Sequence, residues 1–84
     1  MEGTFIMRLE RIQAYLTAKN MPYDYAEEND CGSINLIHRG LSYHIWEFPA
    51  PERGCESNVL SCGRSVEYEG DYEQQILDIF EKTW

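Results

Sequence analysis

Residues 33–48, SINLIHRGLSYHIWEF, constrain the fold more strongly than any other segment of this chain. Two runs of alternating apolar and polar residues flank Arg39-Gly40, and such alternation is typical of half-buried β-strands. A two-residue connection that contains glycine predicts a tight hairpin, although Arg-Gly is weaker turn chemistry than Asn-Gly. This turn pairs His38 with Leu41, and cross-strand partners point to the same side of a sheet.

The predicted register sorts the hairpin into two faces. The face expected to lie in the core, with His38 at its edge, carries Ile34, Leu36, Leu41, Tyr43 and Ile45. The opposite face, which is mixed in polarity, carries Ser33, Asn35, Ile37, Ser42, His44 and Trp46. A slip of one residue would mix the two sets, so their clean separation supports the register.

The segments outside the hairpin predict two helices. Apolar residues fall on one helical face from Thr4 to Lys19, with Thr4 as the N-cap. Asn20 suits a left-handed C-terminal position, and Pro22 prevents continuation. A second helical pattern begins after Asp71, an N-cap followed three residues later by Gln74 as in a capping box.

The remaining segments predict further strands. Residues 23–28 alternate tyrosine with smaller or charged residues, and residues 57–62 read as a short fourth strand. Residues 63–70 either extend that strand or form an irregular connection. We therefore expect one α+β domain spanning residues 1–84. It would contain an N-terminal helix, a three- to four-stranded antiparallel sheet and a C-terminal helix, with both helices on one face.

The chain is strongly acidic, with 15 aspartate and glutamate residues against seven lysine and arginine residues and a formal charge of −8. This balance argues against direct nucleic-acid binding, because neutralising phosphates needs a basic surface. It is compatible with a solvated acidic face, with a basic protein partner, or with a protein that imitates DNA and inhibits a DNA-binding protein.

The sequence has no apolar run near the ~18 residues that a membrane span needs. Charged residues interrupt the first segment, MEGTFIMRLERIQ, where a signal peptide would need an unbroken apolar region. We therefore expect a cytoplasmic protein with no membrane contact.

Three cysteines, Cys31, Cys55 and Cys62, are an odd number without an export signal, which favours free thiols. A zinc site made from these cysteines with His38 and His44 would lack any Cys-x2-Cys knuckle, and the predicted register points the two histidines to opposite faces. We expect no metal and no cofactor. Thiol-imidazole pairs, Cys31 with His38 or Cys55 with His44, stay open as a minor alternative.

Motifs that carry catalysis are missing from the sequence, including GxGxxG, GxxxxGK[ST], HExxH and GxSxG. Only Glu47, between Trp46 and Phe48, sits in a setting apolar enough to raise the pKa of a carboxyl group. The sequence therefore predicts a protein that is not an enzyme and has no catalytic residues.

The mixed face of the hairpin is the leading candidate site for binding another protein, and the acidic C-terminal region is the alternative surface. Tryptophan is a common anchor of protein contact surfaces, and here Trp46 lies among polar neighbours. The predicted contact residues are Trp46, His44, Ile37, Asn35 and Phe48. The alternative is that the loop after Pro49 or the last segment folds over Trp46 and buries it. The expected partner is a protein, whose identity the sequence leaves open together with the oligomeric state.

The run DCGSINLIHRGLSYHIWEF, followed by GRS and EGDYEQQIL, resembles a family of small acidic proteins associated with conjugative transposons of Gram-positive anaerobic bacteria. The similarity extends from about Tyr23 to the last helix. The family has no assigned activity, so the resemblance carries over no functional residue. It implies an accessory protein of a mobile genetic element in the bacterial cytoplasm.

Overall fold

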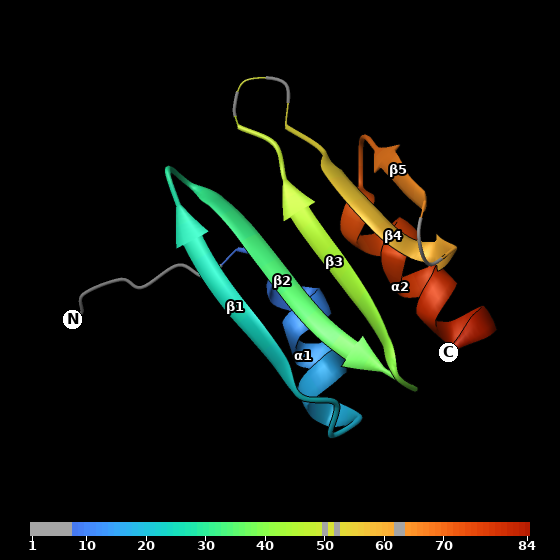
Figure 1. The fold of residues 1–84 in the computed structure, drawn as a ribbon. Coiled ribbons are helices and arrows are strands. Elements are labelled where there is room, and N and C mark those ends of the chain that lie inside the picture. Colours follow the sequence, from blue (N-terminus) through green and yellow to red (C-terminus); the bar gives the residue numbers. More distant parts are fainter. Residues whose placement is uncertain (1–7, 50, 52, 62–63) are drawn as a thin grey trace.

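The computed structural model describes residues 8–49, 51, 53–61 and 64–84. Along the chain, one helix precedes five strands and a second helix follows them (Figure 1). The elements are α1 (Glu10–Ala18), β1 (Tyr23–Glu28), β2 (Cys31–His38), β3 (Leu41–Glu47), β4 (Cys55–Ser61), β5 (Arg64–Tyr68) and α2 (Tyr72–Thr83). The strands form one antiparallel sheet in the order β1-β2-β3-β4-β5, so each pairs with its neighbour in sequence. The predicted α+β architecture is confirmed, and β5 adds a strand to it.

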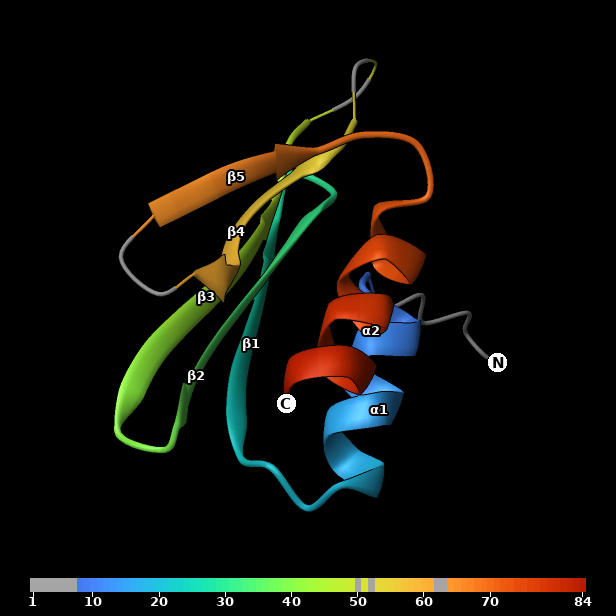
Figure 2. The same cartoon turned by 90° about the vertical axis from the view of Figure 1, so that its right-hand side faces the viewer.

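Both helices pack on the same face of the sheet, as predicted (Figure 2). On α2, Tyr72, Ile76 and Phe80 recur every fourth residue, which places them on one buried stripe. On α1, Ile12 and Leu16 do the same. The buried apolar residues of the sheet in this core are Ile34, Leu36, Ile45, Cys55, Val59 and Tyr68. Neither described helix is long and apolar enough to cross a membrane.

The central hairpin has the predicted register. Its paired residues include His38 with Leu41, Leu36 with Tyr43, and Ile34 with Ile45. Arg39 and Gly40 both have positive φ, 55° and 81°, which the right-handed twist of a two-residue hairpin favours. The prediction that Leu41 lies in the core is wrong, because its side chain is 48% exposed at the tip of the hairpin, next to the turn.

The start of the first helix differs from the prediction. The helix begins at Glu10, and the left-handed backbone of Leu9 (φ 53°) interrupts the expected continuation toward Thr4, which lies outside the described residues. Leu9 supplies no side-chain cap. Instead, Glu73 of α2 accepts hydrogen bonds from the backbone N–H groups of Arg11 and Ile12, at 2.9 and 3.2 Å. A carboxylate from the other helix therefore caps α1.

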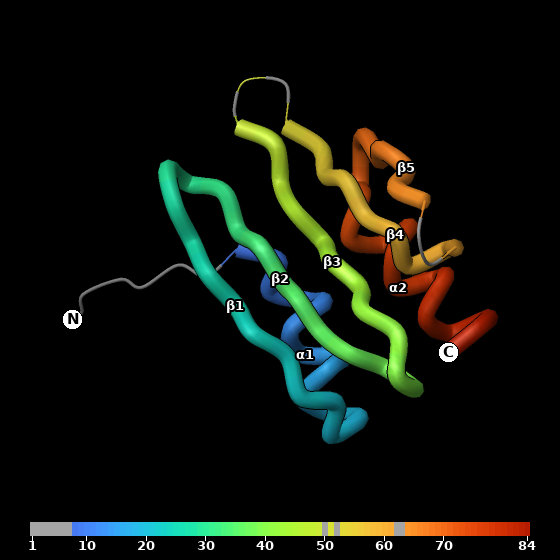
Figure 3. The backbone as a smooth tube through the Cα atoms, in the orientation of Figure 1, coloured from blue at the N-terminus to red at the C-terminus, as the bar shows by residue number. Residues whose placement is uncertain are grey.

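The sheet opens between β3 and β4. Their backbones pair at three positions, from Glu47–Cys55 to Ile45–Ser57. Past Ile45 and Ser57, toward Ser42 and Ser61, the two strands diverge (Figure 3). Beyond this point the Asn58 side chain accepts a hydrogen bond from the His44 N–H (2.9 Å) and donates one to the Ser42 carbonyl (3.1 Å). The carboxamide thus takes the place of a backbone peptide group, which lets β4 bend away without leaving these groups of β3 unpaired.

Candidate functional site

Within the described ranges, no helix covers the face of the sheet that is turned toward the viewer in Figure 1. Trp46 lies on this face, 42% exposed, with Ser33 of β2 and Glu56 of β4 as its cross-strand partners. The predicted outward orientation of Trp46 is confirmed. The alternative in which a later segment buries this indole is wrong.

Side chains from four strands hold Trp46 in place. Its Nε1–H donates to Asn35 Oδ1 at 3.3 Å, and His44 stacks against its ring with centroids 4.2 Å apart. Ser65 Oγ and Glu56 Oε2 in turn lie 3.1 and 3.7 Å from His44 Nε2. We define these five residues, Asn35, His44, Trp46, Glu56 and Ser65, as the open-face patch. The patch presents an oriented aromatic ring in a polar frame.

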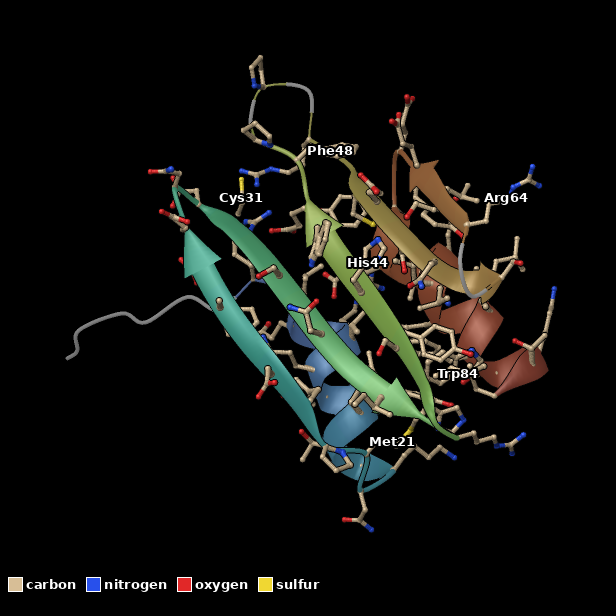
Figure 4. All side chains as sticks on the ribbon, in the orientation of Figure 1. Met21, Cys31, His44, Phe48, Arg64 and Trp84 are labelled. Atoms are coloured by element: carbon tan, nitrogen blue, oxygen red, sulfur yellow. The ribbon has the colours of Figure 1, made fainter. Side chains whose placement is uncertain are left out.

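The other two predicted contact residues lie at opposite ends of the same face. Ile37 is 68% exposed and lines a shallow hollow near the hairpin tip, together with Asn35 and Ser42. Phe48 is half-buried beyond the end of β3 (Figure 4), where it lines a recess with Arg53, Glu67 and Glu69. The structure therefore brings together Trp46, His44 and Asn35, and leaves Ile37 and Phe48 outside the connected patch.

The contacts of His44 do not form a catalytic relay. In a serine–histidine–acid triad the hydroxyl and the carboxylate contact different ring nitrogens, so that a proton can pass through the imidazole. Here both Ser65 and Glu56 face the same nitrogen, Nε2. Their effect is to orient the ring against Trp46.

Glu47 points to the helix side of the sheet and is buried, with its side chain 1% exposed. Arg8 binds both carboxylate oxygens, at 2.9 Å through Nε and 3.0 Å through Nη2. The Gly32 N–H (2.8 Å) and the Tyr72 hydroxyl donate to the same carboxylate. Each oxygen of the Glu47 carboxylate thus accepts two hydrogen bonds. Through Arg8 and Tyr72, the cluster holds the N-terminal end of the described chain to the sheet and to α2.

The expectation of a raised pKa at Glu47 is wrong. Burial is the largest influence and opposes ionisation, but the hydrogen bonds from Arg8, Tyr72 and Gly32 together outweigh it and lower the pKa. Burial followed by the hydrogen bond to Glu47 raises the pKa of Tyr72 to about 12. Sequence reasoning missed the cause because it placed Arg8 inside a helix, and no local pattern connects Arg8 with Glu47, 39 positions along the chain.

The cysteines and histidines are dispersed. Cys55 is buried on the helix side, where burial raises the pKa of its thiol to about 12, whereas His44 lies on the open face. Cys31 and His38 stand at opposite ends of β2, and neither thiol–imidazole pair therefore forms. Among the residues that the structure describes, no three histidine, cysteine or acidic side chains gather in a metal-binding arrangement, and Cys62 lies outside them.

Comparisons with protein-family models, with curated proteins and with solved structures give no match for this chain. The candidate site therefore rests on the geometry of the side chains described above.

Proposed function

We propose that this protein is a non-enzymatic accessory protein that binds another protein through the open-face patch. One observation carries the proposal: Trp46 is 42% exposed, yet Asn35 and His44 hold it in one orientation. An aromatic anchor that is already ordered loses little conformational entropy when a partner covers it. Tryptophan is also among the residues that contribute most to binding energy in protein interfaces.

The chemistry of the buried groups supports a role without catalysis. The Glu47 carboxylate has its acceptor positions occupied and a lowered pKa, so it is a poor general acid or base at neutral pH. The Cys55 thiol, with a pKa of about 12, stays protonated and is a poor nucleophile. His44 orients an aromatic ring in place of relaying a proton.

We infer that this binding takes place in the bacterial cytoplasm, where free cysteines are stable. The resemblance to proteins of conjugative transposons suggests that the partner is encoded by, or acts on, a mobile element. Neither inference changes the surface through which binding occurs.

Imitation of DNA is the weaker alternative. A DNA mimic needs its carboxylates arranged along one continuous surface, as phosphates are along a duplex. Exposed carboxylates here occur in both layers, including Glu10 on α1, Asp24 on β1, Glu67 on β5 and Glu81 on α2. This distribution favours a solvated acidic surface around a local binding patch.

Affinity capture with matched variants tests the proposal. The baits are the wild-type chain, Trp46→Ala, His44→Ala and a control, Leu41→Ala, which removes another exposed apolar side chain away from the patch. We expect the same partner with wild type and control, and its loss with both patch variants, while circular dichroism shows every bait folded. The purified partner should then bind Trp46→Ala at least about tenfold more weakly by calorimetry.

Unchanged affinity for Trp46→Ala would contradict the proposal, as would equal losses for Trp46→Ala and Leu41→Ala. Release of the partner by duplex DNA, with no effect of Trp46→Ala, would favour the DNA-mimic alternative.

A further inference from the structure

Strand β1 forms one margin of the sheet, and within the described ranges no strand lies beyond it (Figure 1). A two-residue turn joins β1 to β2, so the flanking Glu28 and Cys31 exchange both backbone hydrogen bonds and every second pair after them does the same. The residues between these pairs direct their peptide N–H and C=O groups outward. We define the β1 edge as the outward peptide groups of Tyr23, Tyr25 and Glu27.

The β1 edge is more regular than the opposite margin of the sheet. β1 pairs with β2 at six successive positions without interruption. β5 is a residue shorter, and its pairing with β4 shifts register between Ser57 and Ser61. An uninterrupted row of unpaired peptide groups is a template on which another strand can pair.

The side chains along β1 are acidic and have no basic neighbour in the strand. Asp24, Glu27 and Glu28 are all exposed, and Glu27 accepts a hydrogen bond from the Tyr25 hydroxyl at 2.9 Å. In the part of the chain that the structure describes, no basic side chain forms an ion pair with any of the three. Two copies joined through β1 would bring like charges together, which is unfavourable, whereas a basic strand would meet opposite charges.

A recess connects β1 to the open-face patch. Ala26 of β1, Ser33 of β2 and Trp46 of β3 are opposite one another in the register, and all three line this recess together with Glu28. Because alanine and serine are small, the space between the margin of the sheet and the indole stays open. A partner that covers Trp46 therefore also reaches β1.

We propose that the partner pairs an extended, basic segment with the β1 edge as a further antiparallel strand. Antiparallel pairing is the more stable arrangement per residue. Basic side chains of this segment would lie on the open face beside Asp24 and Glu28, and the alternate side chains would lie beside the half-buried rings of Tyr23 and Tyr25. The inference rests on the proposed function, since it describes how the same partner extends beyond the open-face patch.

A titration of the ¹⁵N-labelled protein with peptides tests this inference. The probe is an acetylated octapeptide amide of alternating arginine and valine in 0.15 M NaCl, a concentration that screens distant charges. We expect it to slow hydrogen exchange of the Tyr23, Tyr25 and Glu27 amides. The amides of Ser65 and Glu67, on the outer side of β5, should not change.

Two control peptides separate backbone pairing from charge. N-methylation of each valine keeps the charge and removes the N–H groups that would face β1, and it should weaken binding at least about tenfold. Replacing each arginine by glutamine keeps those N–H groups and removes the charge, and it should also weaken binding at least about tenfold. Equal binding of either control peptide would overturn the inference, as would unchanged exchange of the β1 amides.

Proline variants test the same pairing from the side of the protein. Proline is tolerated on an edge strand where the N–H faces solvent. Glu27→Pro removes an outward N–H, and Glu27→Gln removes the same charge but keeps this donor. We expect Glu27→Pro to weaken peptide binding at least about fivefold more than Glu27→Gln, and Glu67→Pro, the matched change on β5, to alter it less than about twofold. With circular dichroism showing every variant folded, equal losses in the two proline variants would contradict pairing at β1.

The outcomes also separate the two proposals. If the arginine–valine peptide leaves β1 unprotected while Trp46→Ala still loses its natural partner, strand addition is wrong and the open-face patch stands. If the peptide protects β1 while Trp46→Ala keeps its natural partner at full affinity, the β1 edge binds a basic strand and the open-face patch is wrong.

Discussion

The sheet carries one histidine–tryptophan stack on each face, and the two stacks have opposite surroundings. On the helix side, His38 lies on Trp84 with ring centroids 4.4 Å apart and an interplanar angle of 3°. On the open side, His44 lies on Trp46 at 4.2 Å and 29°. Figure 4 labels one member of each pair, Trp84 at the end of α2 and His44 on β3.

Their neighbours explain why similar chemistry has different consequences. Trp84 packs against Phe80 and Tyr43 and donates its Nε1–H to the Val59 carbonyl at 3.3 Å, near the place where β3 and β4 separate. It therefore closes the end of the core. Trp46 contacts side chains of the open-face patch, and neither of the two described helices lies above it. A stack that seals the core contributes to folding, whereas a stack left on an open face remains available for binding.

We expect the largest difference in stability between the two faces when Glu47 and Glu56, on neighbouring strands, are each replaced by alanine. Glu47→Ala should reduce the free energy of unfolding by about 3 kcal/mol, because it leaves Arg8 without its buried partner. Glu56→Ala should change it by less than about 0.5 kcal/mol, because this carboxylate is partly exposed. Urea unfolding followed by far-ultraviolet circular dichroism measures both. Equal losses would mean that the open face also carries the fold.

The free energy of unfolding should depend on pH through three groups on the helix side of the sheet, Glu47, Tyr72 and Cys55. The folded-state pKa of Glu47 lies below its ordinary value of 4.5. Its contribution is therefore present above pH 4.5 and is lost as the pH falls through the lower folded value. Tyr72 and Cys55 have pKa values raised to about 12, so their contributions fall away as the pH rises from about 9 toward 12.

Glu47→Gln provides the control for the acid limb of this profile. It should lose much of the decrease in stability below pH 4.5, because it removes the carboxylate whose pKa is lowered in the folded state. Thermal unfolding from pH 3 to pH 11 measures the midpoints, and a Glu47→Gln profile identical to wild type would remove Glu47 as the cause.

Two asparagines test the same contrast at smaller magnitude. Asn58→Ala should cost about 1–2 kcal/mol, because it leaves the His44 N–H and the Ser42 carbonyl without this partner at the opening of the sheet. Asn35→Ala should cost less than about 0.5 kcal/mol, because its amide only holds an exposed indole. Hydrogen exchange of the His44 amide gives a second readout, which should accelerate in Asn58→Ala alone.

We expect the smallest change in the free energy of unfolding from a substitution in the hairpin turn. Arg39 has a positive φ of 55°, a conformation that asparagine adopts with less strain than arginine. Arg39→Asn should therefore raise the free energy of unfolding by about 0.5 kcal/mol and leave partner binding unchanged. A loss of stability would mean that the turn does not have the left-handed geometry described here.

Much of this architecture follows from local pattern in the sequence. Strict alternation around Arg39-Gly40 predicts both faces of the hairpin, and thereby the outward position of Trp46. Asp71 acts as the predicted N-cap of α2, accepting a hydrogen bond from the Gln74 N–H at 3.3 Å. Asn20 has the expected left-handed backbone, with φ 57°. Each of these features depends on residues close together in the chain.

The features that sequence reasoning missed depend on contacts between distant residues. Glu47 meets Arg8 across 39 positions of the chain, and Glu73 caps α1 from the other helix. In β5, Val66 and Tyr68 alternate with Ser65 and Glu67, but so short a run does not distinguish a strand from an irregular connection, and the pairing that brings Ser65 to His44 and Glu67 beside Glu56 was not predicted. Three residues of the open-face patch, Asn35, His44 and Trp46, were therefore predictable, and Glu56 and Ser65 were not.

Equilibrium unfolding of Trp46→Ala beside Trp84→Ala is the most direct test of the difference between the two faces. We expect Trp84→Ala to lose about 2 kcal/mol or more of unfolding free energy, since it opens the end of the core. Trp46→Ala should lose less than about 1 kcal/mol, since its ring is 42% exposed and lies outside the core. If Trp46→Ala is destabilised as much as Trp84→Ala, the open-face tryptophan belongs to the folding core, and the proposed binding surface is contradicted.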